Sequence, residues 1–170
     1  MTQAHLFVNQ DSGQVEWYTP AAIVEAARRC MGGIDLDPAS SEVANRTVKA
    51  QRYFTADDDG LAHSWYGRVW MNHPYSKINN LRWVPKLIAE YRVGNVAQAC
   101  AIVNASTSEK FFQPLYDYPI CFFAKRVRFV KPCGGLGDSP TKGSAVVYLG
   151  PNVSRFVAEF SSMGRVMLPA

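Results

Sequence analysis

Residues 69–75 read Val69-Trp70-Met71-Asn72-His73-Pro74-Tyr75. The apolar triplet is typical of a buried strand, and the polar segment that follows it is typical of a loop at the end of that strand. Continuous apolar runs recur at 96–103, 120–124 and 145–149. Such runs predict strands that are buried on both faces of a mostly parallel sheet.

Helical patterns alternate with these runs. Thr19 is expected to cap a helix that starts at Pro20 and stops at the Gly32-Gly33 pair. A short strand, Ile34 to Asp37, should follow it and close at Pro38. Further helices are predicted over 81–91, with a late start or a kink at Pro85, and over 108–116 and 152–160.

This alternation predicts an α/β fold with a doubly wound, mostly parallel sheet in a minimal single domain. We expect residues 1–15 to form a flexible N-terminal arm and residues 16–170 to form the domain. Sheets of this kind bind ligands at the carboxyl ends of their strands. Asp37 and Asn72 both lie at such ends, so they open into one crevice if their strands are neighbours.

Composition narrows the class of protein. The chain has 170 residues, of which 48% are hydrophobic and 19% charged, as in a folded globular domain. No run approaches the roughly 18 apolar residues of a membrane span, and no secretion signal is evident, so we expect a cytoplasmic protein without membrane contact. The four cysteines are widely spaced, which favours buried free thiols over disulfides and predicts no metal site.

Basic residues gather in one short segment. Lys125, Arg126, Arg128 and Lys131 alternate in part with apolar residues, and the net charge is +4. A cationic rim of this kind suits the phosphates of a nucleic acid. The alternative interpretation is the solvated end of a strand.

The loop after Met71 has the chemistry to hold a planar exocyclic amine. The Asn72 side-chain oxygen and the His73 backbone carbonyl are two acceptors for the amine protons. Their pull shifts the nitrogen towards a tetrahedral geometry in which its lone pair can attack. Tyr75 is expected to project outward and to stack on the base, a contact worth about 1–3 kcal/mol.

Five segments in this order resemble those of S-adenosylmethionine-dependent amino-methyltransferases of nucleic acids, and most closely the short phage and prophage DNA N6-adenine methyltransferases. The resemblance implies a Rossmann-like methyltransferase fold, S-adenosylmethionine as cofactor and DNA as partner. The segments are residues 16–20, which clasp the cofactor, 36–40 at the end of the first strand, 57–61 near the cofactor's adenine, the catalytic 72–75, and the basic 125–129.

The resemblance also implies roles for individual residues. Catalysis falls to Asn72, His73, Pro74 and Tyr75. Cofactor binding falls to Tyr18, Thr19, Asp37, Pro38, Asp58 and Asp59. DNA binding falls to Lys125, Arg126, Arg128 and Lys131. The function expected is methyl transfer to the adenine N6 of DNA in a bacterial host, as in phage protection from restriction, with short or relaxed specificity read by residues 131–143.

Two departures from the family pattern keep alternatives open. His73 stands where the family has a proline, and Asn72 follows Asp37 by only 35 residues, which leaves little room for two further strand and helix units. Ala39-Ser40-Ser41 likewise replaces the family's glycine-rich turn. No carboxylate is evident for the cofactor ribose. The alternatives are an N-methyltransferase that acts on RNA or on a protein amide, and a DNA-binding relative without activity. The oligomeric state is left open.

Overall fold

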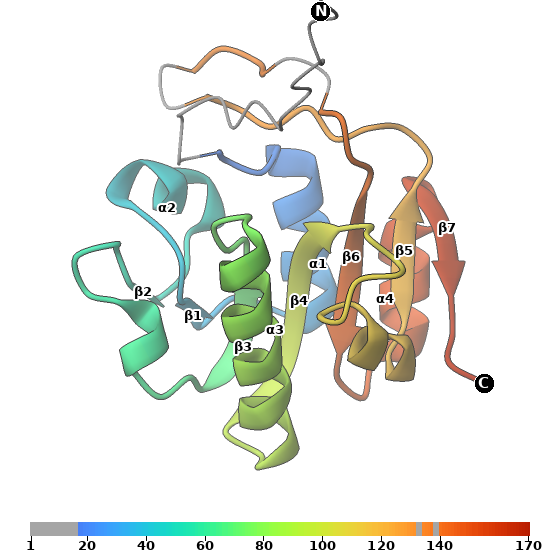
Figure 1. Cartoon of the computed structure of the whole chain (residues 1–170), viewed down its shortest axis with the longest axis horizontal. Coiled ribbons are helices and arrows are strands. Elements are labelled where there is room, and N and C mark those ends of the chain that lie inside the picture. The colour runs from blue at the N-terminus through green and yellow to red at the C-terminus, as the bar shows by residue number, and fades with distance from the viewer. Residues whose placement is uncertain (1–16, 132–133, 138–139) are drawn as a thin grey trace, which may run out of the picture.

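A seven-stranded sheet forms the centre of the computed structural model, which describes residues 17–131, 134–137 and 140–170 (Figure 1). The predicted arm, residues 1–15, lies outside the described residues. In chain order the strands are β1 (Leu36–Asp37), β2 (Arg52–Tyr53), β3 (Gly67–Met71), β4 (Val96–Asn104), β5 (Ile120–Phe123), β6 (Ser144–Leu149) and β7 (Gly164–Met167). Their spatial order is β2-β1-β3-β4-β6-β5-β7.

The sheet is mixed. Strands β2, β1, β3 and β4 pair in parallel, whereas β6 is antiparallel to β4 and β5, and β7 is antiparallel to β5. The α/β class is therefore confirmed, but the prediction of parallel pairing is wrong for β6. All six residues of β6 are buried, and a strand covered on both faces has the same apolar run in either direction.

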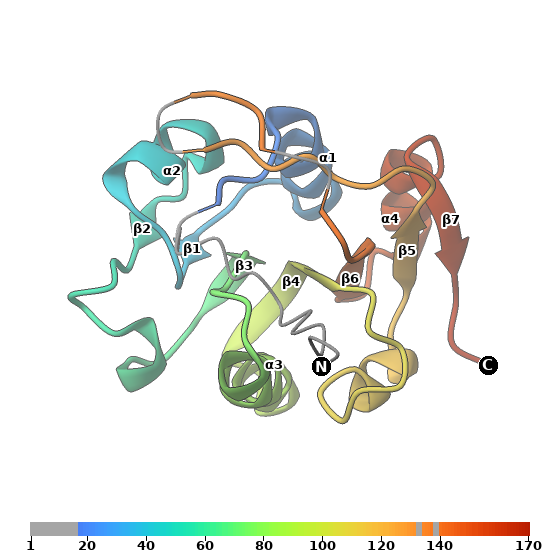
Figure 2. The ribbon, with the colours of Figure 1, turned by 45° about the horizontal axis from the view of Figure 1, so that its top comes forward.

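Helices cover both faces of the sheet (Figure 2). On one face lie α1 (Ala21–Met31) and α4 (Val153–Phe160), and on the other lie α3 (Lys77–Arg92) and the 3-10 helix η2 (Gln113–Asp117). Each face of the sheet has its own hydrophobic core. Strand β3 contributes side chains to both cores, because successive side chains of a strand point to opposite faces. Val69 and Met71 pack with α3, while Trp70 packs with α1.

Two predicted helices are confirmed with corrections at their starts. Helix α1 ends at Gly32, whose φ of 77° lies in the left-handed region that glycine tolerates. Its cap is Pro20, and the expected Thr19 cap is wrong, since the Thr19 hydroxyl makes no hydrogen bond. Helix α3 starts four residues before the predicted Leu81, because the Ser76 hydroxyl accepts a hydrogen bond from the Asn79 N–H over 3.1 Å. Pro85 lies inside it.

The helix predicted over 108–116 is wrong. This segment forms turns and then η2. Phe111 and Phe112 are both buried in the α3-side core, whereas adjacent residues of an α-helix point about 100° apart. Pro114 has no N–H for an α-helical bond to Lys110. The predicted helix over 152–160 is confirmed by α4.

Three elements were not predicted: α2 (Glu42–Val48), β2 and β7. A further 3-10 helix, η1 (Gly60–Ala62), lies between β2 and β3. Thus α2, β2 and η1 are the elements that lie between β1 and β3. The two residues of β2, Arg52 and Tyr53, offer no apolar run by which a strand is recognised.

Cys30, Cys100 and Cys121 are buried free thiols, as predicted, and Cys133 lies outside the described residues. No helix in the described part of the chain is long and apolar enough to cross a membrane. Among the same residues, no group of three or more His, Cys, Asp or Glu side chains is placed to hold a metal ion.

Candidate functional site

The carboxyl ends of β1 and β3 meet at one cavity. Leu36 pairs in parallel with Val69, so the two strands are neighbours, as the shared crevice required. Asp37 and Asn72 line the same cavity of about 520 Å³. From the predicted site, the cavity brings together Tyr18, Thr19, Asp37, Pro38, Asp59, Asn72, His73, Pro74 and Tyr75.

The Asn72 side chain is fixed at both ends. Its Nδ2 donates to the Trp17 carbonyl oxygen over 2.9 Å, and its Oδ1 lies 2.8 Å from the Tyr75 hydroxyl. An amide oxygen has two lone pairs. One therefore remains for a donor that enters the cavity, and the amide cannot rotate without breaking both contacts.

Tyr75 points inward, which differs from the prediction that it projects outward. Its hydroxyl lies 2.8 Å from Asn72 Oδ1 and 3.1 Å from the Ile102 carbonyl oxygen of β4. The ring meets His73 and Phe129 edge-on, at centroid distances of 5.3 and 6.1 Å. Burial raises the pKa of Tyr75 far above its usual value, so the hydroxyl keeps the proton that it shares with these acceptors.

His73 is held as a neutral imidazole. It is 1% exposed, and its Nε2 lies 2.7 Å from Asn80 Oδ1 in the first turn of α3. Burial lowers the pKa of His73 to about 4. Because an amide oxygen only accepts, Nε2 carries the proton and Nδ1 is a bare acceptor. That Nδ1 atom makes no hydrogen bond.

Asp37 is a buried carboxyl group at the tip of β1. It is 2% exposed, accepts a hydrogen bond from the Ala39 N–H over 3.1 Å, and forms no ion pair with any described residue. Burial raises the pKa of Asp37 to about 7, against the opposing effect of the hydrogen bond from the Ala39 N–H. A carboxylate in such a place favours a ligand with a positive charge.

Three buried polar atoms of the described chain lack any hydrogen-bond partner, and all three belong to residues of this cavity: Thr19 Oγ1, Ser40 Oγ and His73 Nδ1. Buried polar atoms are nearly always paired. Three of them around one cavity indicate a place for a polar ligand. With Asp37 they supply two hydroxyls, an imidazole acceptor and a carboxylate.

The η1 segment closes one wall of the cavity through a close backbone contact. A Cβ atom on Gly60 would lie 1.9 Å from the Pro38 carbonyl oxygen, so only glycine fits. Glycine at this position lets the Pro38 backbone approach η1 closely. Asp59 lines the cavity and accepts the Leu61 N–H over 3.2 Å.

Asp58 lies outside the set of residues that line the cavity. Its carboxylate accepts hydrogen bonds from the N–H and the hydroxyl of Thr55, each over 2.8 Å. These bonds lower the pKa of Asp58. The arrangement closes a local turn, so of the two aspartates considered for the cofactor's adenine end, the geometry favours Asp59.

The segment before α1 joins the cavity to the basic residues. Tyr18 and Val130 exchange backbone hydrogen bonds of 2.9 and 2.8 Å. The Trp17 ring packs over Gly137, where a Cβ atom would lie 2.5 Å from it. Since the Trp17 carbonyl also holds Asn72, one short segment contacts the loop at 72–75, residues 125–131 and the loop around Gly137.

The basic segment, residues 125–131, alternates between solvent and core. Lys125, Arg126 and Arg128 are exposed, whereas Val127 and Phe129 are buried. Arg126 donates to the Pro140 carbonyl over 2.8 Å, and Arg128 donates to the Gly137 carbonyl over 3.2 Å. None of its cations pairs with an acidic side chain of the described chain. The segment does not line the cavity but reaches it through the contact of Phe129 with Tyr75.

Sequence reasoning missed three contributors to the site. Ser40 stands where a glycine-rich turn was expected, and its hydroxyl is one of the three unpaired atoms. The Trp17 carbonyl has no sequence signal, since every residue carries one. Arg82 lines the cavity from α3, and the predicted start of that helix at Leu81 hid its position in the second turn, beside the loop at 72–75.

A protein-family model described as DNA N-6-adenine-methyltransferase (Dam) matches residues 8–162 of the chain. A search of curated proteins finds no match to the chain.

Proposed function

The chain belongs to the DNA N-6-adenine-methyltransferase (Dam) family, and we propose that it transfers the methyl group of S-adenosylmethionine to the N6 amine of an adenine in DNA. The family is one of DNA adenine methyltransferases; the cofactor, the site residues and the specificity are the proposal. One observation carries it. A single cavity joins the constrained Asn72 amide to Asp37 and to three unpaired buried polar atoms.

The cavity suits S-adenosylmethionine in size and in donor set. Its volume of about 520 Å³ lies within the roughly 300–1,000 Å³ of small-molecule and cofactor sites. Asp37 would pair with the ammonium group of the methionine part, beside Pro38. Tyr18 and Thr19 would clasp the same part, with the Ser40 hydroxyl close by. Asp59 would lie at the adenine end.

When bound, S-adenosylmethionine supplies a methyl group whose bond to sulfur breaks as its bond to the attacking nitrogen forms. The chain aligns that nitrogen. The free lone pair of Asn72 Oδ1 and the His73 carbonyl would accept the two amine protons. Tyr75 and the Trp17 carbonyl hold the Asn72 amide in the required orientation, so no reorganisation is needed as the reaction proceeds. The methylated nitrogen is acidic and releases a proton without a strong base.

An adenine inside a duplex does not present its amine to the cavity, so the base would swing out of the stack at a cost of a few kcal/mol. Tyr75, with Pro74 beside it, would contact the flipped base. Lys125, Arg126, Arg128 and Lys131 would hold phosphates, which position a strand without reading its sequence. We therefore propose short or relaxed specificity, with the loop from Lys131 to Gly143 as reader. Residues 132–133 and 138–139 of it lie outside the described part.

The test is incubation of the purified protein with genomic DNA and a methyl-labelled donor, followed by digestion to nucleosides. We expect the label to appear in N6-methyldeoxyadenosine. Label that appears only when RNA or protein replaces DNA would favour an RNA or protein-amide methyltransferase. DNA binding without cofactor binding in a titration would favour an inactive relative. A role in shielding phage or prophage DNA inside a bacterial host is proposed from the resemblance alone.

A further inference from the structure

The first two turns of α3 carry an exposed surface beside the cavity. Ile78 is 70% exposed and Leu81 is 44% exposed, and Lys77 and Arg82 are exposed as well. We name these four residues the α3 ridge. Ile78 and Leu81 lie three residues apart, so their exposed side chains are neighbours on the surface of the helix.

Helical geometry places the ridge at the rim of the site. Asn79, Arg82 and Trp83 of α3 line the cavity. Ile78 lies four residues before Arg82, so the two side chains are neighbours on the helix surface. Ile78 lies one turn closer than Arg82 to Ser76, the residue that caps the helix and lines the cavity. An exposed apolar side chain thus stands beside residues of α3 that line the cavity.

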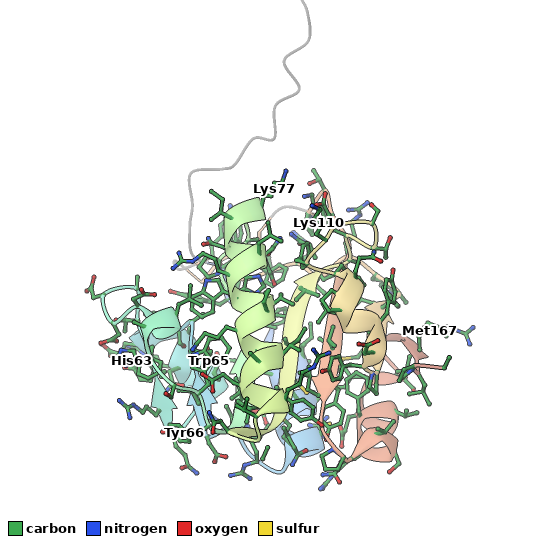
Figure 3. The ribbon with its side chains drawn as sticks, turned by 60° about the horizontal axis from the view of Figure 1, so that its bottom comes forward. His63, Trp65, Tyr66, Lys77, Lys110 and Met167 are labelled. Atoms are coloured by element: carbon green, nitrogen blue, oxygen red, sulfur yellow. The ribbon has the colours of Figure 1, made fainter. Side chains whose placement is uncertain are left out.

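The charge around the ridge is positive and uncompensated. Helix α3 contains no acidic residue before Glu90. Arg82 forms no ion pair with any described residue, whereas Lys86 pairs with Glu90 and Arg92 with Asp117 further along the helix. Lys77 stands at the N-terminal end of α3, at the same edge of the molecule as Lys110 in the loop after β4 (Figure 3). The helix N-terminus adds a partial positive charge there.

The ridge and the basic segment lie on opposite faces of the sheet. Val127 and Phe129 belong to the core on the α1 side, whereas α3 packs on the other core, and Figure 2 shows the two separated by the sheet. Arg82 lines the cavity from one of these faces, and the basic segment reaches it from the other through the contact of Phe129 with Tyr75. A polyanion that spans this edge would contact both.

From these observations we infer that the α3 ridge is a second DNA-contact surface, with Arg82 on a phosphate and Ile78 inserted into the base stack at the place that the flipped adenine leaves. The inference rests on the proposed function. Apolar side chains serve as such wedges in other DNA-binding proteins, where they offset the loss of stacking. A wedge assists a duplex and is of no use to a strand whose bases are already unstacked.

The chain offers matched controls on the same helix. Val93 is 70% exposed, like Ile78, but lies at the far end of α3, so Val93→Ala controls for Ile78→Ala. Arg92→Ala likewise controls for Arg82→Ala. Methyl transfer would be measured on native genomic DNA and on the same DNA after heat denaturation, with cofactor affinity and thermal melting as checks of the fold.

Ile78→Ala should lower kcat/KM on duplex DNA about tenfold, because the wedge would offset only part of the free-energy cost of base flipping. On denatured DNA, kcat/KM should change by less than about twofold. Arg82→Ala should raise KM and reduce the salt slope of binding by about one unit. Equal rates for Ile78→Ala and Val93→Ala on duplex DNA, or equal losses by Ile78→Ala on both DNA forms, would overturn this inference alone. A wild-type protein that methylates neither DNA would overturn the proposed function and the inference with it.

Discussion

At the scale of single residues, the Asn72 amide carries the proposed chemistry of the site. The Trp17 carbonyl and the Tyr75 hydroxyl hold its two ends, which leaves one lone pair of the amide oxygen for the substrate. Asn72→Ala should therefore lower kcat by roughly 10²–10³, as the loss of one preorganised hydrogen-bonding group does, and should leave cofactor affinity nearly unchanged. Single-turnover methyl transfer and cofactor titration measure the two quantities.

Asn95→Ala is the control for that substitution, because the Asn95 side chain bonds Glu90 outside the cavity. Its rate should match the wild type. Equal losses of transfer and of cofactor affinity in Asn72→Ala would show that Asn72 is structural.

If Asp37 binds the ammonium group of the cofactor as proposed, cofactor binding should depend on pH. Its pKa is raised to about 7 by burial, and an ammonium group binds the ionised carboxylate. Affinity for S-adenosylmethionine should be constant above pH 7 and should fall up to about tenfold per pH unit below it, because binding must then release a proton. Asp37→Asn should bind more weakly at pH 8 and show no such slope. Isothermal titration at several pH values checks this, and a wild-type affinity that is flat from pH 8 to pH 5 would remove Asp37 from the ligand site.

The same carboxyl group predicts a change in stability. A folded-state pKa above the unfolded value of 3.8 means that its contribution is favourable at low pH and is lost as the pH rises through 7. The shift corresponds to at most about 4 kcal/mol. Asp37→Asn should thus melt at the same temperature as the wild type near pH 4 and at a higher one at pH 8. A melting-temperature difference that does not grow with pH would contradict the burial of an uncompensated charge.

At the scale of elements, the contact of η1 with the end of β1 shapes the cavity. A Cβ atom on Gly60 would lie 1.9 Å from the Pro38 carbonyl oxygen. Gly60→Ala should displace η1, weaken cofactor binding at least about tenfold and lower stability by about 1–3 kcal/mol, the cost typical of overpacking. Gly143→Ala is the control, since its Cβ atom would meet nothing closer than 3.8 Å. Urea unfolding and cofactor titration of both variants test this, and similar values for the two would contradict it.

The elements also show how far sequence patterns reach. The long apolar runs correctly predicted strands β4, β5 and β6, and the Gly32-Gly33 pair correctly predicted the end of α1. Burial on both faces and a left-handed backbone each favour particular residue types, so both can be recognised in the local sequence. The direction of β6 and the existence of the two-residue strand β2 cannot be recognised in the local sequence, since both depend on pairing with strands that are distant in the chain. Likewise the predicted site residues Asp37 and Asn72 are strand-end residues with a visible pattern. The Trp17 carbonyl and the pairing of Tyr18 with Val130 arise only from tertiary packing.

At the scale of the whole molecule, exposed basic residues lie on both faces of the sheet, in the α3 ridge on one and in the basic segment on the other. If Lys125, Arg126 and Arg128 contact phosphates, each removed contact should lower the slope of log affinity against log salt by about one. The triple alanine variant should therefore bind DNA more weakly at low salt and with a flatter slope. Arg46→Ala, an exposed arginine of α2 that pairs with Glu42, should retain the wild-type slope. A triple variant with an unchanged slope would show that the basic segment does not meet DNA.

We propose that the cavity at the carboxyl ends of β1 and β3 directs a methyl group to the N6 atom of adenine in DNA. The most direct measurement is mass analysis of nucleosides from DNA incubated with S-adenosylmethionine and either the wild-type protein or Asn72→Ala. We expect N6-methyladenine with the wild-type protein and almost none with the variant. Methylation of another base, or equal N6-methyladenine from both proteins, would contradict it.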